Sequence, residues 1–77
     1  MASPLEIVEV KKSFRDKVKK KVSRTAGKKR LKESLNVSYG TIGRLINPGI
    51  VRLSTLQLFV AYLEGPDAQV EEYISKD

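Results

Sequence analysis

Residues 28–47 read KKRLKESLNVSYGTIGRLIN, and the spacing of their apolar side chains fits two short helices that cross at a tight turn. Residues three or four apart share one face of a helix, so each of the two segments has one apolar face. The inward side chains of the two helices are Leu31, Leu35, Ile42, Leu45 and Ile46. The sequence therefore predicts helices over about Ala26–Leu35 and Tyr39–Ile46.

The residues between the two expected helices have the chemistry that a tight turn needs. Asn36 tolerates the left-handed backbone conformation better than any residue except glycine, and such a reversal usually requires that conformation. Val37 follows and is expected to fill the space between the helices. Ser38 is a good N-cap for the second helix, and Thr41 lies three residues further on. The turn is thus predicted from its own residues.

The order of these residues resembles the lambda-repressor-like, Cro-type helix-turn-helix family. The residues that carry the resemblance are Leu31, Leu35, Val37, Ser38, Thr41, Ile42 and Leu45. The likeness covers roughly residues 14–63 and includes residues 54–58, STLQL, which are similar to the start of the family's fourth helix. Two residues depart from the pattern, Lys32 where the family favours a small side chain and Gly43 inside the second helix. The resemblance implies an all-α, compact four- or five-helix domain with a helix-turn-helix.

The composition of the chain alone excludes several classes of function. The chain has 77 residues, which suffice for one domain with a single small core. It contains no cysteine and no histidine, so disulfides and zinc-finger ligation are excluded. No apolar run approaches the roughly 18 residues that a membrane span needs, so no membrane partner is expected. The sequence shows no nucleophile–base pair, metal-ligand cluster or glycine-rich phosphate loop, and we expect a non-enzymatic protein without a cofactor or metal.

The charges of the chain are strongly segregated. The formal net charge is +6, from 15 basic and 9 acidic residues. Twelve of the basic residues lie between Lys11 and Lys32, where Asp16 is the one acidic residue. Acidic residues instead dominate the end of the chain, as Glu64, Asp67, Glu71, Glu72 and Asp77. Such segregation is typical of a protein that presents one face to a polyanion and another to solvent or a protein.

The beginning of the chain allows two interpretations. Ser3 as N-cap, Pro4 in the first turn and Glu6 as its capping-box partner predict a first helix that ends near Val22. Its buried stripe would be Ile7, Val10, Phe14, Val18 and Val22. The β-branched content of Leu5–Val10 equally suits a short strand that pairs between subunits.

Further along the chain, capping residues predict where the remaining helices begin. Thr25 is the expected cap of the helix over Ala26–Leu35, and residues 50–53, IVRL, are expected to run extended. Ser54 with Gln57 predicts a capping box for a fourth helix that ends near Leu63. Gly65-Pro66 would stop this helix. Asp67 would then cap a last short helix that carries Val70, Tyr73 and Ile74.

The second helix of the expected pair leaves a polar set of residues facing outward. The candidates for contact with DNA bases are Ser38, Tyr39, Gly40, Gly43, Arg44 and Asn47. Arg44 can donate two hydrogen bonds to guanine, and Asn47 can pair with adenine. Arg44 could instead contact phosphate alone, Tyr39 could be a partly buried packing residue, and Asn47 could serve only as a C-cap. The candidates for phosphate contact are Thr25, Lys28, Lys29 and Arg52.

Together these features predict a DNA-binding transcriptional regulator, with double-stranded DNA as its partner and a cytoplasmic, nucleoid-associated location. A homodimer on DNA is the expected assembly, through the C-terminal helix or through Leu5–Val10. Two alternatives stay open. One is a largely non-specific nucleoid-type or RNA-binding protein, and the other is a protein-interaction module such as an antitoxin or a phage adaptor.

Overall fold

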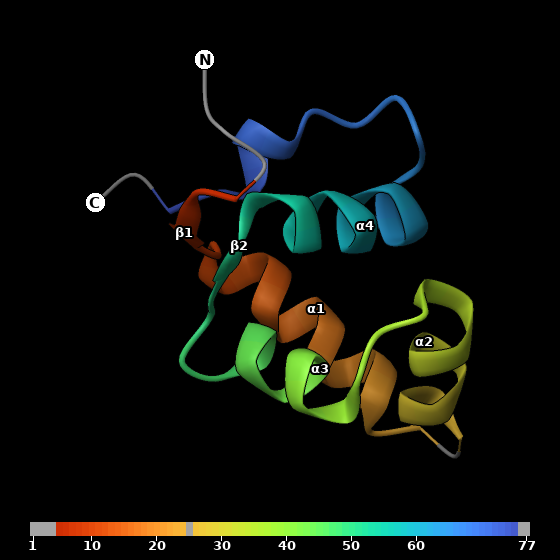
Figure 1. The fold of residues 1–77 in the computed structure, drawn as a ribbon. Helices are drawn as coiled ribbons and strands as arrows, with labels where there is room; N and C mark the ends of the chain where they lie inside the picture. Colours follow the sequence, from red (N-terminus) through yellow and green to blue (C-terminus); the bar gives the residue numbers. More distant parts are fainter. Residues whose placement is uncertain (1–4, 25, 76–77) are drawn as a thin grey trace.

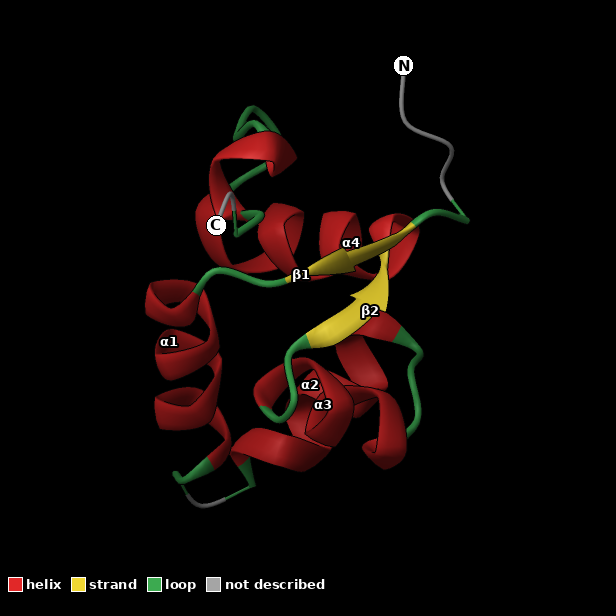
Figure 2. Cartoon of the chain, turned by 90° about the vertical axis from the view of Figure 1, so that its left-hand side faces the viewer, coloured by secondary structure: helices red, strands yellow, loops and turns green. Residues whose placement is uncertain are grey.

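The structure is a computed structural model that describes residues 5–24 and 26–75. Its elements in chain order are β1 (Ile7–Glu9), α1 (Lys12–Val22), α2 (Gly27–Leu35), α3 (Tyr39–Ile46), β2 (Ile50–Arg52), α4 (Leu53–Glu64) and a 3-10 turn, η1 (Val70–Tyr73). Figures 1 and 2 both place α4 above and α3 below, with α1 between these two levels. The described chain is therefore mostly helical, with one short two-stranded sheet. None of the described helices combines the length and the apolar character needed to cross a membrane.

One apolar cluster holds all the elements together. Its buried members are Val10, Phe14, Val18, Leu31, Ile42, Leu45, Val51, Leu53, Leu56, Phe59, Val60 and Val70. Every helix and β2 contribute to it, because each element keeps its apolar side chains on one face. The core therefore fixes α2 and α3 against α1 and leaves their polar faces outside.

The two helices α2 and α3 and the turn between them form as the sequence predicts. Asn36 has φ of 55°, which is the left-handed conformation expected of it. The backbone N–H of Thr41 donates to the Ser38 hydroxyl oxygen at 3.1 Å, which caps α3. Val37 is half-buried and packs against the core. These local interactions set the end of one helix and the start of the next.

The prediction of a helix that begins near Ser3 is wrong for the described part of that segment. Residues 7–9 form β1, and α1 begins only at Lys12. β1 pairs antiparallel with β2, with Val8 opposite Val51. Ser3 and Pro4 lie outside the described residues, and Glu6 accepts a strand-type bond from the backbone N–H of Leu53 at 2.7 Å.

The all-α prediction therefore needs correction, because the β-branched residues of this segment find a partner strand in the same chain. The alternative of a strand is confirmed, but its pairing is within the chain. Val8 and Val51 point toward the core side, while Ile7 and Ile50 are exposed at 60% and 42% on the outer side of the sheet.

Two of the expected helix caps are not formed. Ser54 and Gln57 do not cap α4, since the helix already begins at Leu53 and is preceded by Arg52 without a side-chain cap. β2 ends at Arg52 and α4 begins at the next residue, so strand pairing sets the start of this helix. Asp67 caps no helix either, because η1 begins at Val70 after Gln69 and is only a 3-10 turn. Thr25 lies outside the described residues, and Ala26 precedes α2 with φ of 62° and no side-chain cap.

The C-terminal segment packs on its own domain. The Tyr73 ring lies 5.1 Å from the Phe14 ring, centroid to centroid, and Ile74 forms a bridge with Val10. The backbone N–H of Lys11 donates to the Tyr73 carbonyl at 2.8 Å. The apolar side chains that the sequence assigns to a last helix therefore serve the core of the same chain.

Candidate nucleic-acid interface

The outward face of α3 carries the polar residues expected from its periodicity. Ser38, Gly40, Arg44 and Asn47 are exposed, and Tyr39 is 44% exposed. Ile42 and Leu45 on the opposite face are fully buried, which fixes the rotation of the helix about its axis. Five of the six predicted base-contact residues are thus exposed, and Gly43 is half-buried.

Two of these residues also have structural tasks. The Ser38 hydroxyl caps α3 and lies 3.0 Å from the Thr41 hydroxyl oxygen. Asn47 is the C-cap residue, and its backbone N–H donates to the Gly43 carbonyl at 2.9 Å. Both side chains remain at the surface, so these tasks are compatible with a contact to a ligand.

Tyr39 is held between two lysines of α2. The Lys28 and Lys32 ammonium groups lie 5.4 Å and 5.3 Å from the centroid of its ring. Both lysines lie one turn apart on the flank of α2 that faces α3, and cations at this distance are attracted by the ring. Two cations and a phenol hydroxyl therefore meet at the N-terminal end of α3.

The middle of the outward face of α3 has no side chain. A Cβ atom at Gly43 would meet nothing within 4 Å, and one at Gly40 would meet only the Ser38 hydroxyl at 3.7 Å. Packing within the chain therefore does not explain either glycine. Together they leave a bare strip of helix backbone between Tyr39 and Arg44.

The C-terminal end of α3 is anchored by Arg15 of α1. The Arg15 Nε–H donates to the Ile46 carbonyl at 2.8 Å, and the side chain is half-buried against Gly49. Beside it lies a hollow of about 230 Å³, lined by Lys12, Arg15, Asp16, Lys19, Ile46 and Asn47. Cations therefore stand at both ends of α3.

The predicted phosphate-contact residues are not all brought together. Lys28 and Lys29 lie in the first turn of α2, and Lys29 is 4.0 Å from Glu33 in an exposed ion pair. Arg52 lies at the end of β2, directly before α4. Thr25 lies outside the described residues.

Sequence reasoning did not single out Lys32 and Arg15 as parts of this surface. Lys32 follows Lys28 by four residues, so helical spacing contained the signal for it. Arg15 reaches α3 across 31 residues of sequence, and no local pattern indicates that contact.

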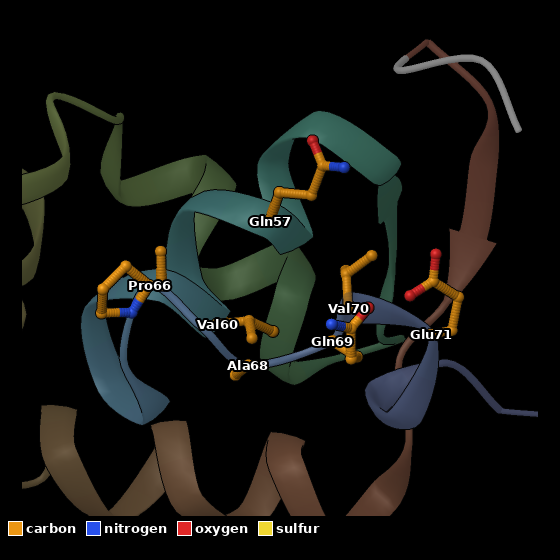
Figure 3. A pocket seen from close by; sticks show the side chains of 8 residues that line it. Gln57, Val60, Pro66, Ala68, Gln69, Val70 and Glu71 are labelled. Carbon is orange, nitrogen blue, oxygen red and sulfur yellow. The ribbon is translucent and has the colours of Figure 1, made fainter.

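A second hollow, of about 330 Å³, lies between α4 and residues 66–71 and has a different character (Figure 3). Pro66 and Glu71 lie at its two ends, with Val60, Ala68 and Val70 between them. Of the described residues that line it, Glu71 alone ionises. This hollow offers no arrangement of charges comparable with that around α3.

Comparison of the chain with protein-family models, with curated proteins and with solved structures gives no match. A function must therefore be argued from the geometry of the chain itself.

Proposed function

We propose that the chain is a DNA-binding protein that inserts α3 into the major groove as the second helix of a helix-turn-helix. The observation that carries this proposal is the composition of one surface, in which an exposed helix face with Tyr39, Arg44 and Asn47 has cations at both ends. An α-helix with its side chains is about 10 to 12 Å in diameter, and the major groove is about 12 Å wide.

Each part of this surface has a role in the proposal. Arg44 donates two hydrogen bonds to a guanine, and Asn47 reaches a neighbouring base. The bare backbone at Gly40 and Gly43 lets the helix come close to the base edges. Lys28 and Lys32 bind phosphates at one end of α3, and Lys12 and Lys19 bind them at the other.

The proposal includes transcriptional regulation as a dimer, located with the nucleoid. Because Val70, Tyr73 and Ile74 pack on the core of their own chain, η1 presents chiefly Glu71 and Glu72 to a partner. The outer side of the sheet, with exposed Ile7 and Ile50, is the better candidate for the contact between two chains. We therefore favour the segment Leu5–Val10 over the C-terminal segment as the contact between the two chains.

Selection of bound duplexes from a random pool, followed by Arg44→Ala, tests the proposal. We expect an enriched motif and a loss of about 1 to 3 kcal/mol on the selected duplex, because a bidentate guanine contact contributes that much discrimination. On a random duplex the loss should be smaller. Equal losses on both duplexes would reduce Arg44 to a phosphate contact, and a pool without any enrichment would favour the non-specific alternative.

A further inference from the structure

Helix α1 has two basic flanks that face different parts of the molecule. Successive residues of a helix are turned by about 100° around its axis. The buried residues Phe14 and Val18 mark the inward side of α1, and its basic residues lie on either side of them. Arg15 lies on the flank that contacts α3, as its bond to Ile46 shows. Lys17 lies on the other flank and pairs with Glu64 of α4. Lys21 follows Lys17 by one turn and shares its flank.

On the α4 side of α1 there is a hollow of about 200 Å³ that the proposed DNA contact does not use. Its lining is Lys21, Arg24, Gly27, Arg30, Leu31 and Tyr62. A Cβ atom at Gly27 would collide with the Lys21 carbonyl oxygen, so the chain passes very close to itself at this point. Tyr62 of α4, one of the lining residues, is 49% exposed. Three cations and a phenol hydroxyl thus surround one opening.

The cations of this hollow are not neutralised within the described chain. The described residues that line the hollow include no carboxylate, and the ion pairs of the described residues join Lys17 to Glu64 and Lys29 to Glu33. Like charges that are held close together destabilise the folded chain unless an anion binds between them. Arginine forks and a tyrosine hydroxyl are the donors that proteins use to hold phosphate oxygens.

This hollow faces away from the surface that carries Tyr39. Arg30 is turned by about 160° to 200° from Lys28 and Lys32 around the axis of α2, because it lies two residues from each. Tyr62 belongs to α4, and Figures 1 and 2 both place α4 on the side of the molecule opposite α3. Helix α2, about 10 to 12 Å in diameter with its side chains, lies between the two surfaces. A phosphate backbone held at α3 therefore does not fill this hollow.

We propose that Lys21, Arg24, Arg30 and Tyr62 form a second site for the phosphate backbone of DNA, so that one chain holds two duplexes at once. The inference rests on the proposed function for the first duplex, which is bound at α3. Arg24 and Arg30 bind phosphate oxygens through their guanidinium groups, Lys21 adds a third cation, and the Tyr62 hydroxyl donates a hydrogen bond. The site reads no base, since it is a hollow at the junction of α1, α2 and α4 without a projecting helix.

Capture of a second duplex tests the site. A short random duplex is attached to beads, the protein is bound and washed, and the same duplex carrying a fluorescent label is added. The wild-type chain is expected to retain the labelled duplex. The variant Lys21→Gln/Arg30→Gln is expected to retain at least about tenfold less, because two phosphate contacts are lost.

Lys11→Gln/Lys20→Gln is the matched control, because it removes the same charge from two exposed lysines that do not line the hollow. It is expected to retain the labelled duplex much as the wild type does. Equal capture by the two double variants would overturn the second site. A dimer that holds one duplex on each chain would also capture the labelled duplex, and neither double variant would prevent this. Tyr62→Phe removes only the hydroxyl of a half-exposed residue and is expected to lower capture by a smaller factor, which keeps a test available if the double variant does not fold.

Two further measurements distinguish a failure of the second site from a failure of the proposed function. When Lys28→Gln/Lys32→Gln is added to the Lys21→Gln/Arg30→Gln variant, binding of a single duplex reports on the α3 surface alone. Unchanged affinity there would contradict the proposed function and not the second site. A wild-type chain that binds the bead duplex but retains no labelled duplex would contradict the second site alone. Retention of labelled poly-glutamate in place of the labelled duplex would assign the hollow to an acidic protein and would also overturn it.

Discussion

Gly43 is the residue at which the demands of folding and of the proposed DNA binding diverge most clearly. It lies inside α3, where glycine is about 1 kcal/mol less favourable than alanine, and a Cβ atom there would meet nothing within 4 Å. Gly43→Ala is therefore expected to raise the free energy of unfolding by up to about 1 kcal/mol in a denaturant titration. The same change should weaken binding to DNA, because the methyl group separates the helix backbone from the base edges. A variant that is more stable and binds DNA as tightly as before would contradict the proposed close approach.

Lys28 and Lys29 are neighbours in the first turn of α2, but only Lys28 lies against the Tyr39 ring. Lys29 instead points toward Glu33. Lys28→Ala is expected to weaken binding several-fold for all sequences and to lower the salt dependence of the affinity by about one counterion, since each phosphate contact releases about 0.9. Lys29→Ala is the control and should have the smaller effect on both quantities. Equal effects would mean that the contact with Tyr39 does not direct Lys28 to a phosphate.

At the scale of the element, the position of α3 depends on the loop that follows it. Gly49 has φ of 82°, and a Cβ atom there would lie 2.5 Å from the Arg15 Nε. Gly49→Ala therefore strains the backbone and also displaces Arg15 from the Ile46 carbonyl. Gly65→Ala is a matched control, because Gly65 also has a positive φ, of 106°, but open space around it.

We expect Gly49→Ala to lower the free energy of unfolding by about 1 to 3 kcal/mol more than Gly65→Ala does, since a hydrogen bond from a charged group is lost only at Gly49. Thermal or denaturant unfolding of the two variants measures the difference. If the two losses were the same, Arg15 would not anchor the end of α3.

The same scale explains which elements could be predicted. The bounds of α3 and the turn before it follow from Asn36 and Ser38, whose effects are local. Local sequence leaves helix and strand open for the segment that forms β1, because its partner β2 lies more than forty residues away. For the same reason the start of α4 was misplaced, since strand pairing and not Ser54 determines it.

The candidate DNA surface, like the elements, can be predicted only where local pattern determines it. Helical periodicity alone placed Tyr39 and Arg44 on the outside of α3, and the structure confirms that exposure. The contact between Arg15 and Ile46 and the hollow beside Tyr62 depend on how α1 and α4 pack, which no local pattern encodes.

At the scale of the whole molecule, the fold converts a linear segregation of charge into a spatial one. The basic residues between Lys11 and Lys32 lie on α1, α2 and the segment that joins them, and the acidic residues Glu64, Asp67, Glu71 and Glu72 lie at the end of α4 and beyond it. The proposed DNA surface at α3 is therefore free of the acidic segment. This arrangement would attract a polyanion from solution and orient it toward α3.

The most direct test of the proposed DNA surface is a titration of the isotope-labelled protein with a short duplex, followed by the chemical shifts of its backbone amides. We expect the largest changes from Ser38 to Asn47 and in the first turn of α2, with small changes in β1, β2 and η1. Unchanged shifts throughout α3, with the largest changes on the sheet or at the C-terminal segment, would contradict the account.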